Sequence, residues 1–214
     1  GKERYLYEPS YIYFETQSYP PSSNEYFKKL KENLIKLNRL LEKNEKELYV
    51  FITPSKANFC SEYIPDRYAC LTNRGKYNYT NYSKLLEILD SSNIYYFDST
   101  QYIKNNLKNN LYESPVFYKS GIHWSNAWGK RSAAQFLDYM NQNSKYMMAK
   151  VSVTETSSSA PIDPDTDLYS SLNLLNKPNE KWYAAEMTVD VPGKDRPNVF
   201  FRGGSFMGQS LSAL

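Results

Sequence analysis

The chain has 214 residues, which is enough for one α/β domain with a full core or for two small domains. Its 26 basic and 23 acidic side chains give a formal net charge of +3, which is too balanced to indicate a nucleic-acid partner. An apolar fraction of 41% excludes a disordered chain, and the sequence contains no run of about 20 apolar residues that would span a membrane.

The N-terminal part of the chain is expected to form a strand, a helix and a second strand. Alternating aromatic positions over 1–13 favour a short strand. Leucines at three- and four-residue steps predict a long amphipathic helix over 25–47. The continuous apolar run 48–53 predicts a buried parallel strand, and the loop after it carries Lys56 at the edge where open α/β sheets bind ligands.

The rest of the chain predicts further alternation of helices and strands. We expect helices over 81–91, 101–107 and 126–140, another beginning at Ser205, strands over 94–97, 116–118 and 198–201, and a β-ribbon over 182–191. The segment 151–177 is rich in Ser, Thr, Asp and Pro, and we expect it to be a long loop or an insertion. This order predicts a single α/β domain over 1–214, with a mostly parallel sheet and helices on both faces.

Two stretches carry candidate catalytic residues. His123 is the only histidine, so an imidazole that acts as acid or base near neutral pH has to be this one. Near the C-terminus an apolar run is followed by Gly203, Gly204 and Ser205, the layout of a turn that exposes a nucleophilic serine. We therefore expect Ser205 and His123 to lie within hydrogen-bond reach or about one water apart. The alternative is a packed or surface histidine without a catalytic role.

Metal and nucleotide chemistry have little support. One histidine and two cysteines, Cys60 and Cys70, leave few ligands for a zinc enzyme, and no glycine-rich nucleotide-binding motif is present. We predict neither a metal nor another cofactor. Two cysteines allow either one local disulfide or two free thiols.

Four stretches, in this order, resemble one family. They are residues 1–8, Phe51–Lys56 with Glu62–Pro65, His123–Asn126 with Gly129, and Gly203–Phe206. They are similar to the opening segment, the Pro-x-Lys and Glu-Tyr-Leu-Pro segment, the Asp-x-His-Trp block and the Gly-Asp-Ser-Phe nucleophile block of the alginate O-acetyltransferases of the AlgJ and AlgX type. That resemblance implies a circularly permuted SGNH hydrolase-like fold, with the histidine block before the serine block.

The resemblance also implies an activity and a site. Ser205 would be the nucleophile and His123 its general base, in an O-acetyltransferase that modifies hydroxyls of an exopolysaccharide or a cell-wall glycan. Lys56, Tyr118 and Trp124, which lie in or beside the matching stretches, would contact the substrate.

The resemblance further implies the protein's surroundings. The polysaccharide would be the acceptor, and a membrane-bound acyltransferase partner would supply the acetyl group. The location would be the periplasm or the cell surface, with anchoring through a removed N-terminal segment. In that setting we expect Cys60 and Cys70 to form a disulfide.

The chain departs from the family pattern at two aspartates, because Gly121 stands two residues before the histidine and Gly204 directly before the serine. Ser120, a backbone carbonyl or an acid from elsewhere would then have to orient the imidazole; otherwise the site is a dyad with weakened activity. Two alternative functions stay open, a carbohydrate acyl esterase and a catalytically silent glycan-binding module. The chain ends nine residues after Ser205, and we expect the domain to continue beyond that point.

Overall fold

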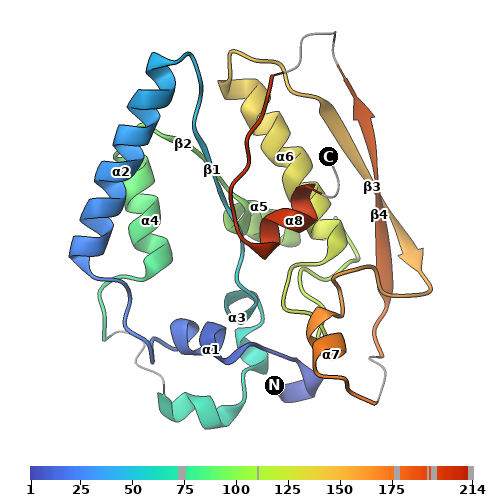
Figure 1. Cartoon of the computed structure of the whole chain (residues 1–214). Coiled ribbons are helices and arrows are strands. Elements are labelled where there is room, and N and C mark those ends of the chain that lie inside the picture. The colour runs from blue at the N-terminus through green and yellow to red at the C-terminus, as the bar shows by residue number, and fades with distance from the viewer. Residues whose placement is uncertain (72–75, 110, 176–178, 192, 194–196, 212–214) are drawn as a thin grey trace.

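The structure is a computed structural model, and it describes residues 1–214 except 72–75, 110, 176–178, 192, 194–196 and 212–214 (Figure 1). The side chains of residues 69–71 and 209–211 also lie outside the described part. The described α-helices are α1 (Pro9–Glu15), α2 (Asn24–Lys43), α3 (Lys56–Phe59), α4 (Asn81–Asp90), α5 (Ser99–Leu107), α6 (Asn126–Asn143), α7 (Asp167–Ser171) and α8 (Ser205–Leu211). The described strands are β1 (Tyr49–Ile52), β2 (Tyr95–Asp98), β3 (Lys150–Ser158) and β4 (Trp182–Asp190). Short 3₁₀ helices span Lys2–Arg4, Ser61–Tyr63 and Asp66–Leu71.

Strands β1 and β2 form a parallel pair covered by helices on both faces. The register runs from Tyr49 opposite Tyr95 to Ile52 opposite Asp98. Side chains alternate along β1, so that Ile52 packs with α4 while Phe51 packs with α6. In Figure 1 helices α2 and α4 lie side by side on one side of this pair, and α6 lies on the other. The predicted α/β arrangement is therefore present around two described parallel strands.

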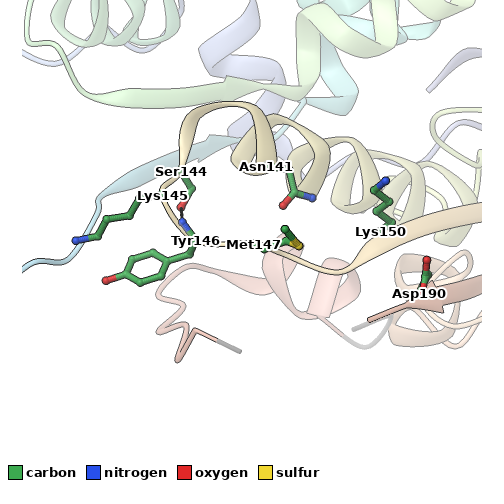
Figure 2. Close-up of a pocket in the computed structure, with 7 residues that line it drawn as sticks. All are labelled: Asn141, Ser144, Lys145, Tyr146, Met147, Lys150 and Asp190. Atoms are coloured by element: carbon green, nitrogen blue, oxygen red, sulfur yellow. Dashed lines mark hydrogen bonds between the residues drawn. The ribbon is translucent and has the colours of Figure 1, made fainter. Parts of the chain in front are cut away.

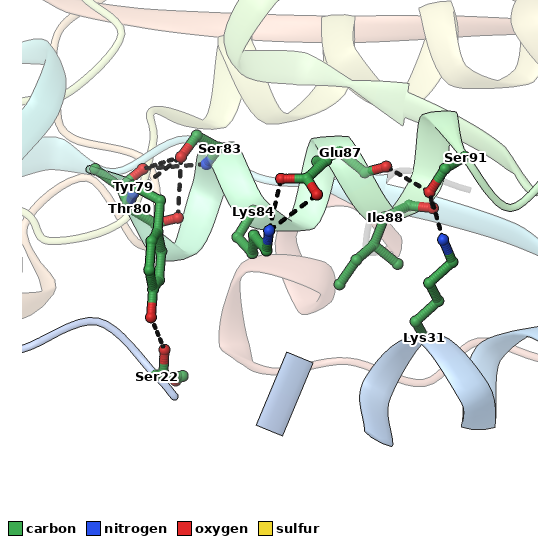
Figure 3. A network of polar contacts seen from close by, with 9 residues as sticks. All are labelled: Ser22, Lys31, Tyr79, Thr80, Ser83, Lys84, Glu87, Ile88 and Ser91. Atoms are coloured by element: carbon green, nitrogen blue, oxygen red, sulfur yellow. Dashed lines mark hydrogen bonds and ion pairs between the residues drawn. The ribbon is translucent and has the colours of Figure 1, made fainter. Parts of the chain in front are cut away.

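Polar contacts at the two ends of α4 join it to α2 and to the segment that precedes α2 (Figure 3). The Lys31 ammonium donates a hydrogen bond to the Ser91 hydroxyl at 2.9 Å, and the Tyr79 hydroxyl donates to the Ser22 carbonyl at 2.9 Å. Thr80 and Ser83 form a reciprocal capping box that starts α4. These contacts fix the layer that supports β1 from the side opposite α6.

Strands β3 and β4 form an antiparallel ribbon, which corrects the expectation of a loop over 151–177. Lys150 lies opposite Asp190 at one end and Ser158 opposite Trp182 at the other, and the ribbon packs against α6. The Ser- and Thr-rich composition suggested a loop, but Val151, Val153 and the threonines are β-branched and suit a strand once a partner pairs with them. Only the later part of the segment is irregular, around α7.

Three other predicted strands are absent from the described residues. Residues 9–15 form α1 instead, because Pro9 occupies the first turn of a helix, where its missing N–H costs nothing. Residues 116–118 are buried but irregular, and 198–201 run as extended chain with Phe200 89% exposed. In the described part of the chain, no helix is both long enough and apolar enough to cross a membrane.

Candidate active site

Ser205 and His123 meet at the start of two helices. Ser205 is the first residue of α8, and His123 lies in the loop that leads into α6. The Ser205 hydroxyl oxygen lies 2.7 Å from Nε2 of His123, which is the predicted hydrogen-bond contact. Helix α8 packs against α6 (Figure 1), so contact between these helices brings together two side chains that are 82 positions apart in the sequence.

Asp167 supplies the acid that the sequence comparison left open. Its Oδ2 is hydrogen-bonded to Nδ1 of His123. Its Oδ1 accepts hydrogen bonds from the main-chain N–H groups of Ile122 at 2.8 Å and Leu168 at 2.7 Å. The imidazole is therefore held between a carboxylate on Nδ1 and a hydroxyl on Nε2, the geometry of a serine triad.

The pKa of Asp167 lies below its ordinary value. Burial by itself raises the pKa of this carboxyl group, but the hydrogen bonds from His123 and from the Ile122 and Leu168 N–H groups stabilise the anion and outweigh burial. Asp167 is therefore ionised near neutral pH and can stabilise an imidazolium ion on His123.

Gly121 leaves the space through which Asp167 approaches the ring. A Cβ atom at position 121 would stand 2.6 Å from the carbonyl oxygen of Asp165 and 3.3 Å from Oδ1 of Asp167. The segment carrying Asp165 and Asp167 thus occupies the place of a side chain at position 121. In the family pattern the aspartate stands two residues before the histidine. Here the acid is Asp167, which stands 44 residues after His123.

Buried polar contacts hold the segment that carries the acid. The carboxylate of Asp165 accepts hydrogen bonds from the N–H groups of Asn126 at 3.1 Å and Ile162 at 3.3 Å. Its carbonyl accepts from the Ser120 hydroxyl at 3.3 Å, and the Tyr169 N–H donates to the Ser120 carbonyl at 3.0 Å. Burial raises the pKa of Asp165 to about 7, although its two main-chain hydrogen bonds oppose that shift.

Phe206 connects the nucleophile to the core. Its ring centroid lies 4.6 Å from that of His123 and 6.1 Å from that of Trp124, which is completely buried. The same ring therefore packs on the imidazole and anchors α8, so the positions of Ser205 and His123 depend on one side chain.

The three residues expected to contact substrate are all buried, which corrects that expectation. Lys56, Tyr118 and Trp124 are 1%, 1% and 0% exposed. The Lys56 ammonium donates to the carbonyls of Tyr118 at 2.7 Å and Lys119 at 3.0 Å, and also to that of Gly121. The Tyr118 hydroxyl accepts from the Tyr183 N–H at 3.0 Å. Packing leaves these three side chains no surface that a ligand could reach. Their contacts instead support the loop before His123.

A shallow pocket lies away from this site. It is found at the C-terminal end of α6, where Tyr146, Lys150 and Asp190 are among its lining residues (Figure 2). The triad instead lies at the N-terminal end of α6, so the pocket and the triad occupy opposite ends of that helix.

The predicted Cys60–Cys70 disulfide lies outside the described residues, because the side chain of Cys70 is not described. Cys60 is buried and has a free thiol, and burial raises the pKa of that thiol to about 11.

The family comparison matches residues 7–201 to the SGNH hydrolase-like domain of the acetyltransferase AlgX. The chain belongs to this family of SGNH hydrolase-like domains, which confirms the predicted family and the SGNH hydrolase-like fold, while the circular permutation stays a prediction. The matched range contains His123 and Asp167 and ends just before Ser205.

Several solved structures are similar to the chain at low identity. The O-acetyltransferase domain of Pseudomonas putida AlgJ is 17% identical with a TM-score of 0.48, over 82% of this chain and 61% of that one. Pseudomonas aeruginosa AlgX is 15% identical with a TM-score of 0.47, over 86% and 42%. Bacillus cereus PatB1 is 12% identical with a TM-score of 0.46, over 87% and 57%. The alignments thus cover about half of those proteins, and no curated protein sequence matches the chain.

Proposed function

We propose that this chain is an O-acetyltransferase that passes an acetyl group through Ser205 to hydroxyls of an exopolysaccharide or a cell-wall glycan. The observation that carries the proposal is the hydrogen-bonded sequence from Asp167 to His123 to Ser205 in a member of the AlgX family. A serine hydroxyl is a weak nucleophile until a base removes its proton, and His123 is placed to do so.

The proposed reaction has two half-reactions. In the first, Nε2 of His123 takes the Ser205 proton while the serine oxygen bonds to the acetyl carbonyl carbon of the donor. The tetrahedral intermediate then collapses, the donor oxygen leaves with the proton from His123, and acetyl-Ser205 is formed. In the second, a glycan hydroxyl gives its proton to His123 and its oxygen attacks this ester. The Ser205 oxygen then leaves with the proton from His123, which restores the free serine and leaves the acetyl group on the sugar.

Exposure within the triad fits this chemistry. Ser205 is exposed, whereas the side chains of His123 and Asp167 are 16% and 23% exposed. Donor and acceptor can therefore reach the hydroxyl while the imidazole and carboxylate stay partly shielded from water, which strengthens their interaction. The main-chain N–H of Ser205, at the start of α8, is our candidate donor to the oxyanion.

A carbohydrate acyl esterase is the second candidate. The same triad would serve it, with water in place of the sugar hydroxyl in the second half-reaction. The exposure of Ser205 favours access by water as well as by a glycan. The silent glycan-binding module has less support, because such a module has no need of an ionised acid aligned on a histidine–serine pair.

We further propose an extracytoplasmic location and a membrane-bound acyltransferase partner that supplies the acetyl group, with no part for nucleic acid. These proposals rest on family membership. Anchoring through a segment upstream of this chain belongs to the same proposal.

Acetyl transfer from an activated acetyl ester tests the activity. The wild type is expected to hydrolyse the ester slowly and to carry an acetyl group on the peptide that contains Ser205, detected by mass spectrometry. Ser205→Ala should lose both signals, while Ser170→Ala, at an exposed serine of α7, should retain them. Equal turnover by wild type and Ser205→Ala would refute the enzyme. Faster turnover when an oligosaccharide is added, with acetylated sugar as product, separates the transferase from the esterase.

A further inference from the structure

We propose that Lys56 is a positioning residue of this site, which sets the hydrogen bond between Asp167 and His123 through the peptide group that joins Gly121 to Ile122. The inference rests on the proposed function for its catalytic meaning, but its geometry stands independently of any activity.

The Lys56 ammonium is enclosed by protein. Lys56 is the first residue of α3, directly after the β1 loop, and it is 1% exposed. Its three N–H donors are matched by three carbonyl oxygens, those of Tyr118, Lys119 and Gly121. The rings of Tyr5 and Tyr7 lie 5.5 Å and 5.3 Å from Nζ, within the range of cation–π attraction.

This enclosure excludes a ligand. With all three donors used, the ammonium has no free N–H for a substrate. The N-terminal segment also closes over it, since the Leu6 N–H donates to the Lys119 carbonyl at 2.8 Å. Burying a charge costs free energy unless all of its hydrogen bonds are made. The Lys56 ammonium is therefore held in one position by its three carbonyl acceptors.

One peptide group connects the Lys56 ammonium to the triad. The carbonyl oxygen of Gly121 accepts from Lys56, and the N–H of the same peptide unit, that of Ile122, donates to Oδ1 of Asp167 at 2.8 Å. A peptide group is planar, so fixing its oxygen fixes the direction of its N–H. A cation on the oxygen also polarises the group and strengthens the N–H as a donor.

Electrostatics supports the same connection. Burial lowers the pKa of Lys56 to about 8, and the negative charges of Cys60, Glu180 and Asp167, in their ionised forms, oppose the shift. Asp167 therefore lies within electrostatic reach of the ammonium. The charge on Lys56 stabilises the ionised acid, and removing it should weaken the hold of Asp167 on the imidazole.

The single histidine makes the test direct, because every imidazole NMR signal of this protein belongs to His123. Lys56→Met removes the ammonium and keeps a similar stem. We expect the NMR signal of the Nδ1 proton of His123 to shift upfield. We also expect kcat for ester hydrolysis to fall by about 10²-fold with KM nearly unchanged, because Ser205 and its surface stay in place.

A matched control and a second measurement keep the test decisive. Lys104→Met removes an exposed lysine that donates to Asn58 of the same α3 helix, and it should leave the His123 signals unchanged. If Lys56→Met does not fold, the wild type is titrated from about pH 7 to about pH 10, and the Nδ1 signal should move as Lys56 loses its proton.

Other titratable groups also lie around Lys56. They are the Gly1 amino group, with a pKa lowered from 8.0 by burial and by Arg67 and Lys56, and Cys60, Tyr5 and Tyr7, with pKa values raised to about 11 or above. Nearby Glu180 and Asp167 carry carboxyl groups. A variant whose ring signals superimpose on those of the wild type, or a wild-type signal constant over the titration, would overturn the proposal. If the wild type does not hydrolyse the ester, the proposed enzyme activity is refuted, but the NMR test of the role of Lys56 is unaffected.

Discussion

The carboxylate of Asp167 reaches the imidazole of His123 from a segment 44 residues further along the chain, over a glycine that leaves room for it. In the pattern that the sequence resembles, the acid stands two residues before the histidine. Here Gly121 occupies that position. Because it has no side chain, it leaves the room that the segment carrying Asp167 needs. A carboxylate retained at a new place in the sequence argues for a working triad rather than a weakened dyad.

Asp167→Asn tests the acid. The amide keeps an oxygen for the Ile122 and Leu168 N–H groups but cannot stabilise an imidazolium, so we expect kcat for acetyl ester hydrolysis to fall by up to ~10⁴-fold. Asp163→Asn, at an exposed aspartate four residues earlier, is the matched control and should turn over like the wild type. Equal rates for the two variants would remove Asp167 from the mechanism.

Gly121→Ala tests the space that the acid uses. A Cβ at this position would stand 2.6 Å from a main-chain oxygen, so the segment around Asp165 has to move. We expect the free energy of unfolding to fall by about 1–3 kcal/mol and ester turnover to fall with it. Gly121→Asp meets the same contact and should lose activity rather than restore it.

The control for position 121 is Gly208→Ala, where an added Cβ meets nothing within 4 Å. Urea unfolding and ester hydrolysis of both variants give the comparison. A Gly121→Ala protein as stable and as active as Gly208→Ala would show that the segment at 165–167 can move freely away from the ring.

Phe206→Ala tests the anchor of the nucleophile. Its ring contacts both His123 and Trp124, so its removal should let Ser205 move relative to Nε2. A displacement of about 1 Å is enough to lower kcat by about 10²-fold. Phe200→Ala removes an aromatic ring that is 89% exposed in the same C-terminal segment, and it should have no comparable effect on rate.

Asp165 predicts a specific pH dependence of stability. Its ordinary pKa is 3.8 and burial raises it to about 7, so between these values the folded protein keeps a proton that the unfolded chain loses. The contribution of Asp165 to the free energy of unfolding is therefore fully present below about pH 4. This free energy decreases as pH rises towards 7.

Asp165→Asn should lack this decrease. Urea unfolding at several pH values between about 4 and about 7 gives the free energy of unfolding for wild type, Asp165→Asn and the exposed-site control Asp190→Asn. We expect the wild-type and control curves to fall together relative to the Asp165→Asn curve. Three parallel curves would contradict the buried proton.

Elements with local signals could be predicted from the amino-acid sequence alone. The apolar spacing of 25–47 is enough to predict α2, because one face of a long helix shows its period in the residues themselves. The buried run around Tyr49–Ile52 and the helix that begins at Asn126 follow from the same kind of pattern. The glycines before Ser205 and the unique histidine likewise identify two members of the site, because the chain has one Gly-Gly pair and one histidine.

The third member of the site and the residues that support it could be recognised only in the folded chain. Asp167 stands in a Ser-, Thr- and Asp-rich stretch with several other carboxylates, and nothing local distinguishes it from Asp163 or Asp165. Its role depends on contacts with Ile122 and His123, which arise only when distant segments pack together. The same holds for Lys56, which by residue type suggested a surface ligand for substrate. Its burial under the N-terminal segment is a property of packing, and packing between distant segments leaves no periodic trace in the sequence.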